Sequence, residues 1–277
     1  MKTYIENYKH FGELLFVEKG DIKLGIPLSF GIRILFLSYK NSENLLFEQP
    51  QDDTFLVDES GWRIYGGHRY WIAPESDDDY ALENMPISYK IDGEKIILTQ
   101  NEDLKLKVIK SIEISFDGEN RVKLLHKMKS TMQKPRKFSS WAITSLDGGG
   151  TQYIPIEYNK QQYFPLTRIS MWYYTNLGDK RAEYFENYIK LSHGENDGKR
   201  FKIGVSHPNG PIKYINHGVV FEKIYQIFKD KEYPDGNSSY ETYMCDFMTE
   251  VESLSPLSEV DYLQTTSFEE IWQLSKE

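Results

Sequence analysis

Hydrophobic and polar positions alternate in short runs separated by turn dipeptides, which is the pattern of half-buried β-strands. In residues 121–131, for example, Val122, Leu124 and His126 alternate with Lys123 and Lys127. Strands are expected in residues 13–18, 32–39, 45–48, 88–91, 95–100, 104–116, 121–131, 138–146, 152–156, 168–174, 201–206, 212–216, 219–228, 239–253 and 265–274. Residues 179–191 are the best candidate for a helix, but their aromatic and β-branched residues leave that choice open.

Tight turns connect several of these runs. The dipeptides Asp92-Gly93, Asp117-Gly118 and Asn209-Gly210 each stand between two runs and favour a β-hairpin. Regular strands at short spacing over this length predict an all-β fold, a single large antiparallel β-sandwich domain over residues 1–277. Two such sheets leave a concave face, on which polar side chains can line a ligand site.

The composition narrows the classes of partner. Of 277 residues, 39% are hydrophobic and 27% charged, as in an ordinary globular protein. The formal net charge of −9 argues against nucleic acid, which requires a basic surface. No stretch suits a membrane span or a signal peptide, so we expect a cytoplasmic protein unless a leader was removed. The lone Cys245 is expected to be a small buried residue.

The most distinctive segment, residues 61–75, combines aromatic rings with hydrogen-bond donors. Trp62 and Trp71 offer flat apolar faces, while His68 and Arg69 offer donors to hydroxyls and carboxylates. A sugar needs this mixture, because it has C–H faces for stacking and hydroxyl edges for hydrogen bonding. The alternative is a core strand in which the tryptophans are buried, preceded by a Gly-Gly turn.

Carboxylates gather in a second distinctive segment, residues 233–257. Glu250 and Glu252 are two residues apart, so in a strand they point to the same face. Two such carboxylates repel, and at least one needs a cation, a donor or a proton. One of them could be a base that removes a proton from a sugar hydroxyl, and both could equally be solvent-facing acids. Glu241 and Lys202 are candidates for binding the substrate.

Two other runs have simpler explanations than a bound ion. Residues 77–79 are three aspartates, but they lack the spacing of a calcium loop. Residues 148–150 are three glycines, but no Lys-Ser/Thr pair follows them as in a phosphate-binding loop. We expect a solvated loop and a turn, respectively, and we expect no cofactor and no metal ion.

Four segments together resemble an uncharacterised bacterial branch of the galactose mutarotase-like, or aldose 1-epimerase-like, supersandwich proteins. They are residues 66–75 (GGHRYWIAPE), 141–144 (WAIT), 201–204 (FKIG) and 233–256. The resemblance implies a β-supersandwich with a carbohydrate-binding concave face. It also implies a histidine that acts as the catalytic acid and a glutamate near the C-terminus that acts as the base. Either Glu250 or Glu252 could correspond to that glutamate. The family's Asn-His pair would fall near residues 141–144, which contain no histidine, so His68 would have to replace it.

The leading hypothesis is therefore a carbohydrate-binding protein that acts on a sugar by acid/base chemistry, as an epimerase, a mutarotase or a glycoside-processing enzyme. His68 would be the acid and Glu250 or Glu252 the base. The substrate would be positioned by Trp62, Arg69, Trp71, Lys202 and Glu241. The alternative is a non-catalytic carbohydrate-binding module, which would show aromatic residues without a facing acid and base.

Overall fold

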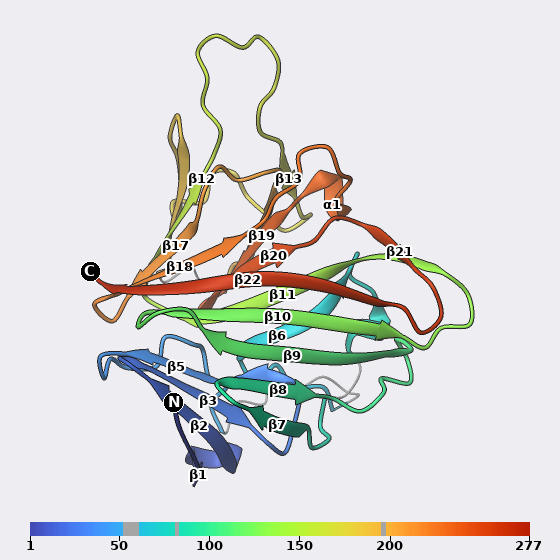
Figure 1. The fold of residues 1–277 in the computed structure, drawn as a ribbon. Coiled ribbons are helices and arrows are strands. Elements are labelled where there is room, and N and C mark those ends of the chain that lie inside the picture. The colour runs from blue at the N-terminus through green and yellow to red at the C-terminus, as the bar shows by residue number, and fades with distance from the viewer. Residues whose placement is uncertain (52–60, 81–82, 195–197) are drawn as a thin grey trace.

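The computed structural model describes residues 1–51, 61–80, 83–194 and 198–277. Its described part is built from three antiparallel sheets, and the only α-helix there is the single turn α1 (Pro234–Asn237). Short 3₁₀ turns span Lys9–Phe11 and Asp77–Tyr80. Within the described residues, no helix has the length and apolar character that crossing a bilayer requires. The all-β prediction is confirmed (Figure 1).

The largest sheet has ten strands, several of which follow one another across the front of Figure 1. In spatial order they are β14 (Ala182–Tyr184), β15 (Tyr188–Ser192), β12 (Thr151–Pro155), β17 (Ile212–Asn216), β18 (Val219–Tyr225), β22 (Thr265–Lys276), β10 (Arg121–Ser130), β9 (Val108–Phe116), β8 (Lys95–Thr99) and β7 (Ser88–Asp92).

The second large sheet has eight strands and carries the site described below. Its spatial order is β13 (Ile169–Met171), β16 (Phe201–Val205), β19 (Tyr240–Met244), β20 (Met248–Leu254), β11 (Arg136–Asp147), β6 (Gly67–Ala73) and β4 (Arg33–Ile34), and β21 (Ser258–Val260) also pairs with β11. A smaller four-stranded sheet contains β1 (Lys2–Asn7), β2 (Glu13–Lys19), β3 (Ile22–Pro27) and β5 (Phe36–Tyr39).

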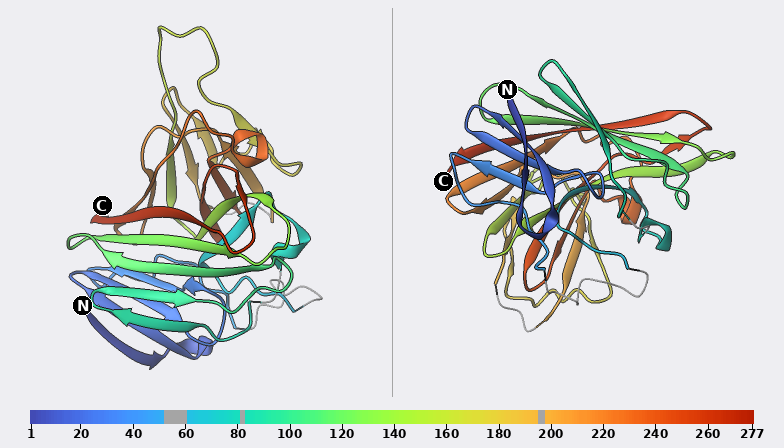
Figure 2. Two further views of the ribbon diagram at one scale, coloured as in Figure 1. Left: turned by 45° about the vertical axis from the view of Figure 1, so that its right-hand side comes forward. Right: turned by 90° about the horizontal axis from the view of Figure 1, so that it is seen from below.

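The main core takes side chains from all three sheets, whose arrangement Figure 2 shows from two further sides. Side chains alternate between the faces of a strand. On β6, Tyr70 and Ile72 therefore enter this core together with Trp272 of the ten-stranded sheet. Trp71 belongs to a separate cluster on the outer face of the eight-stranded sheet. That face is also hydrophobic, which explains why every residue of β6 is buried.

Several local predictions hold and others do not. The Asp92-Gly93 and Asp117-Gly118 turns close the hairpins β7–β8 and β9–β10, and the glycines at 148–150 form the turn between β11 and β12. The Asn209-Gly210 hairpin is wrong, because β16 pairs within the eight-stranded sheet and β17 within the ten-stranded one. The ambiguous residues 179–191 contain two paired strands, β14 and β15, instead of a helix. The expected strand at 32–39 is divided between two sheets, as β4 and β5.

Candidate functional site

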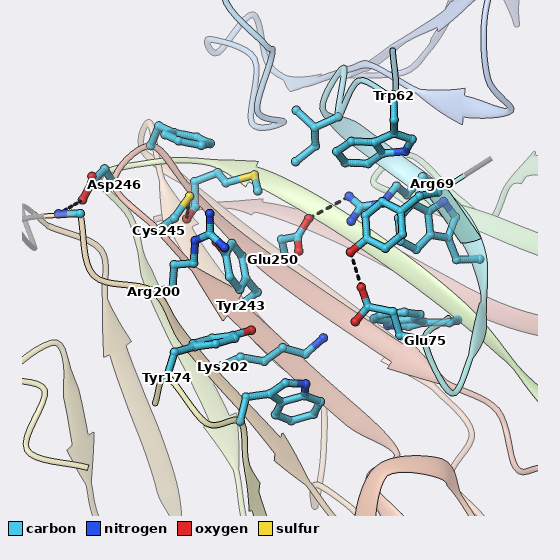
Figure 3. A pocket seen from close by; sticks show the side chains of 18 of the residues that line it. Trp62, Arg69, Glu75, Tyr174, Arg200, Lys202, Tyr243, Cys245, Asp246 and Glu250 are labelled. Atoms are coloured by element: carbon cyan, nitrogen blue, oxygen red, sulfur yellow. Dashed lines mark hydrogen bonds and ion pairs between the residues drawn. The ribbon is translucent and has the colours of Figure 1, made fainter. Parts of the chain in front are cut away.

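A cavity of about 850 Å³ lies on the outer face of the eight-stranded sheet (Figure 3). The described residues that line it are mainly aromatic or charged: Trp62, Ile64, Arg69, Trp71, Glu75, Tyr80, Trp141, Trp172, Tyr173, Tyr174, Gly198, Arg200, Lys202, Tyr243, Cys245, Asp246, Phe247, Met248 and Glu250. Pockets for small ligands have volumes of this order, with a mainly apolar lining and a few placed polar groups.

Strand register explains why these polar side chains meet. Lys202 pairs with Tyr243, Tyr243 with Glu250, and Glu250 with Ser145, so one row crosses four neighbouring strands. Residues directly opposite in adjacent antiparallel strands place their side chains on the same face. Arg69 stands in the next row, opposite Ile143. The row therefore delivers a cation, a phenol and a carboxylate to the floor of the cavity.

Glu250 is held by two donors on neighbouring strands. Arg69 Nη1 donates to Glu250 Oε1 at 2.8 Å, and Ser145 Oγ donates to the same oxygen at 2.7 Å. Arg69 also donates to Ser145 Oγ at 3.0 Å, which closes a triangle of polar contacts. Glu250 is only 6% exposed, so the guanidinium compensates a charge that is largely removed from water. Within the described chain, Oε2 receives no hydrogen bond.

Lys202 lies between two further carboxylates. Its Nζ is 3.0 Å from Glu241 Oε2 and 3.4 Å from Glu252 Oε2. Trp141 Nε1 also donates to Glu252 Oε2, at 2.9 Å. Burial alone would lower the pKa of Lys202, but the charges of Glu252 and Glu241 outweigh it and raise that pKa above its ordinary value. The ammonium therefore stays charged although it is 5% exposed.

Both carboxylates have raised pKa values, whereas a surface acid in an ion pair has a lowered one. Burial raises the pKa of Glu252 to about 7, against the opposing charge of Lys202 and with the added charge of Glu250. Burial also raises the pKa of Glu241 well above its ordinary value. One ammonium between two buried carboxylates leaves an excess negative charge, so the pair retains a proton more readily than a surface acid.

Aromatic residues surround these charges. The Trp71 ring packs edge-on against Trp62, Tyr80 and Trp141, with centroids 6.1, 5.3 and 5.9 Å away. The Arg69 guanidinium lies 4.6 Å from the same ring. Because Trp71 is only 2% exposed, its faces are already covered, which favours the core interpretation of this tryptophan over a free stacking surface. Trp62 and Trp172 are half-buried and retain exposed area.

The expected placement of His68 in this cleft is wrong. His68 directly precedes Arg69 on β6, so alternation turns it to the inner face, where it is 0% exposed. Its Nε2 lies 2.8 Å from His126 Nε2, and its Nδ1 lies 2.9 Å from Thr144 Oγ1. Burial, followed by the charges of His126 and Lys223, lowers its pKa well below the ordinary value, so the imidazole is neutral.

The histidines belong to a polar network between the large sheets. Lys223 Nζ donates to Thr144 Oγ1 at 3.0 Å and lies 3.2 Å from Glu270 Oε2. In the described chain, His68, His126 and Glu270 are the only group whose ligand atoms lie close enough, within 4.8 Å, to hold a metal ion. Each of these side chains already has hydrogen-bond partners, and Lys223 already balances the charge of Glu270. The network is therefore satisfied by its own members.

Other sequence-predicted residues divide between two neighbouring spaces. Arg69, Lys202 and Glu250 line the main cavity, whereas Glu241 lines an adjoining pocket and Glu252 is fully buried behind Lys202.

Cys245 is 7% exposed, and burial raises the pKa of its thiol to about 11. Of the three aspartates at 77–79, two are exposed as expected. Asp79 is buried and accepts hydrogen bonds from the amide and hydroxyl of Ser76.

The sequence interpretation missed several residues of the site. Trp141 and Ser145 each lie two residues from Ile143 on β11 and share its outer face, so the alternation of that strand could have identified both. Trp172 follows β13 in an irregular segment, and no periodic signal indicates that its ring reaches Lys202, whose Nζ lies 4.7 Å from the ring centroid.

The architecture is that of the galactose mutarotase-like sandwich proteins. A galactose mutarotase-like protein from Lactobacillus casei superposes with a TM-score of 0.62 at 10% identity, covering 95% of this chain and 100% of that one. Another from Clostridium acetobutylicum gives 0.55 at 11% identity, covering 99% of both chains. A protein from Escherichia coli, provisionally described as an aldose 1-epimerase, gives 0.61 at 8% identity over the whole of both chains. No protein-family model and no curated protein matches the sequence.

Proposed function

We propose that the protein binds a pyranose-like sugar in the main cavity and that Glu250 accepts a proton from the anomeric hydroxyl. The placement of Glu250 carries this proposal. It sits on β20, in the interior of the eight-stranded sheet, within an aromatic-lined cavity. Arg69 and Ser145 fix Oε1, so the orientation of Oε2 is set before a ligand arrives. The names of proteins with the same fold support a sugar as the ligand.

The chemistry would be interconversion of anomers. Glu250 removes the proton of the anomeric hydroxyl, the bond between the anomeric carbon and the ring oxygen breaks, and the ring oxygen gains a proton. The resulting aldehyde rotates and closes from its other face, which returns both protons. Lys202 is the proton donor that the wall of the cavity offers to the ring oxygen. It regains that proton when the ring closes, and the carboxylates of Glu241 and Glu252 would hold its ammonium group in place.

Stacking would hold the ring of the sugar. Trp62 and Trp172 line the cavity and are half-buried, so each presents apolar area beside the polar floor. Trp71 packs against Trp62 as a support instead of a contact surface. The substrate-binding role expected for Trp71 thus becomes a positioning role for Arg69 and Trp62.

A non-catalytic carbohydrate-binding protein is the second candidate. One observation favours it: among the described residues that line the cavity there is no histidine, and His68 lies on the opposite face of the sheet. In this alternative Glu250 and Arg69 would bind hydroxyl groups without transferring protons.

The test uses a panel of monosaccharides, with thermal shift to find a ligand and titration calorimetry to measure its affinity. Exchange between anomers is then followed by NMR in the presence of wild type, Glu250→Gln, or Glu259→Gln as an exposed control on β21. We expect the Glu250 variant to bind the sugar but to lose at least 100-fold in exchange rate, within the range typical of a positioned base. Binding without accelerated exchange in the wild type would support the binding protein instead. No binding by any sugar would contradict both functions.

A further inference from the structure

A second pocket of about 430 Å³ adjoins the main cavity and has a different character. It is lined by Glu75, Ser76, Asp77, Tyr80, Trp141, Trp172, Asp235 and Glu241. Four of these residues carry carboxyl groups, and none of these eight is a lysine or arginine. Glu75, Tyr80, Trp141 and Trp172 also line the main cavity, so the two spaces share a wall. A ligand in the main cavity could therefore extend a substituent into this acidic pocket.

Lys202 does not neutralise this pocket. Its ammonium lies against Oε2 of Glu241 and Oε2 of Glu252, so one positive charge already serves two carboxylates. Glu241 is 1% exposed, and its other oxygen, Oε1, is buried with no hydrogen-bond partner in the described chain when the neighbouring acids are ionised. Such a buried, unpaired oxygen is costly unless a donor reaches it.

Asp235, which lies beside Glu241 in this pocket, is also largely removed from water. Its carboxyl is close enough to Glu241 to share a hydrogen bond when one of the two is protonated. Burial raises the pKa of Asp235, and the charge of Glu75 acts in the same direction. The two acids therefore need either a retained proton or an additional cation between them.

The position of Asp235 is fixed by its backbone. Asp235 has φ of 50° and the following Gly236 has φ of 76°, so the turn at α1 places two consecutive residues in the left-handed region. The hydroxyl groups of Ser170 and Ser238 both donate to the Asp235 carbonyl, at 2.7 and 2.8 Å. The carboxyl group is thus presented by a held turn instead of a free loop.

We propose that this acidic pocket binds the ammonium group of an amino sugar whose ring occupies the main cavity, an inference that rests on the proposed function. An ammonium supplies three donors, which suits Glu241 Oε1 and the carboxyl of Asp235. The rings of Trp141 and Trp172 flank the pocket and attract a cation, as they already do for Lys202, whose Nζ is 4.7 Å from each centroid. A metal ion fits less well, because these acids do not form a group with ligand atoms within reach of one centre in the described chain.

The experiment compares glucose, galactose and mannose, each as the parent sugar, the 2-amino sugar and the 2-acetamido sugar, by titration calorimetry near neutral pH. The acetamido sugars keep the ring and the nitrogen but lack the charge. We expect at least one amino sugar to bind roughly 10-fold more tightly than both its parent and its acetamido form, the factor that 1.4 kcal/mol produces. Asp235→Asn should remove this preference while retaining affinity for the parent sugar. Asp78→Asn, which removes an exposed acid outside the pocket, should leave the preference unchanged.

The outcomes separate this inference from the proposed function. If parent sugars bind as tightly as amino sugars, the amino-sugar pocket is wrong and the sugar site remains. If the amino sugar is preferred but Asp235→Asn keeps the preference, the ammonium is bound elsewhere and the assignment to this pocket fails. If no sugar of any series binds, both the inference and the proposed function are wrong. Melting curves of both variants establish that they are folded before the affinities are compared.

Discussion

Replacing Glu252 by Gln should make the protein more stable at high pH relative to the wild type. Glu252 is fully buried, and burial raises its pKa from an ordinary 4.5 to about 7. Between these two values the unfolded chain releases the proton while the folded protein keeps it. The free energy of unfolding of the wild type therefore falls as the pH rises through this window, and the loss is complete above about pH 7.

The magnitude follows from the two pKa values. Each unit of difference corresponds to about 1.4 kcal/mol, so the window from 4.5 to about 7 represents about 3 kcal/mol. Gln keeps the shape of the side chain and an oxygen that can accept from Trp141 Nε1, but it does not titrate. Relative to wild type, Glu252→Gln should gain up to about 3 kcal/mol between pH 4.5 and 7 and then remain level.

The assay is urea unfolding, followed by tryptophan fluorescence, at about pH 5, 6, 7 and 8. The quantity to compare is the difference between variant and wild type, because the titration of distant groups cancels in it. Glu259→Gln, which removes an exposed carboxylate on β21, should give a nearly constant difference. A constant difference for Glu252→Gln as well, or one that favours the wild type as pH rises, would refute the reasoning about burial.

Three further single substitutions and one double variant test the packing and the buried ion pairs of the sheets. Trp71→Ala should cost about 3–5 kcal/mol in urea unfolding, because the ring is 2% exposed, and unchanged stability would mean that the ring contributes little to the packing. Arg69→Met should cost about 3–5 kcal/mol, because it leaves Glu250 buried without its cation. Adding Glu250→Gln should recover at least half of that loss, and failure to do so would deny the coupling. Lys223→Met should cost a similar amount, because it leaves the fully buried Glu270 without its cation. An unchanged melting temperature in calorimetry would contradict this role of the ion pair.

Strand alternation accounts for much of what could be predicted about the site. It places Glu250 and Glu252 on one face, as expected, and the structure has both on the outer face of β20. The same rule separates His68 from Arg69, which are adjacent residues, once residues 67–73 are recognised as a strand. The expectation that His68 and Arg69 act together in one site overlooked this alternation.

Long-range contacts could not be derived from the sequence in the same way. Arg69 and Glu250 are separated by 181 residues, and only the order of strands in the eight-stranded sheet brings them together. The Asn209-Gly210 turn fails for a related reason. A turn dipeptide indicates that the chain reverses, but it does not specify whether the next strand pairs with the previous one or enters the other sheet. Here it enters the other sheet.

The polar network between the large sheets influences the register in which β22 pairs with its neighbouring strands. A slip of two residues would keep every core-facing side chain of this strand directed inward, so hydrophobic burial alone barely distinguishes the correct pairing. The slip would, however, move Glu270 about 7 Å along the strand, away from Lys223, and leave two opposite charges unpaired between the layers. It would also take the carbonyl of Phe268 away from His126. The buried ion pair and the two imidazoles therefore specify the register of β22. Registers that bury similar hydrophobic area would leave a charged group unpaired.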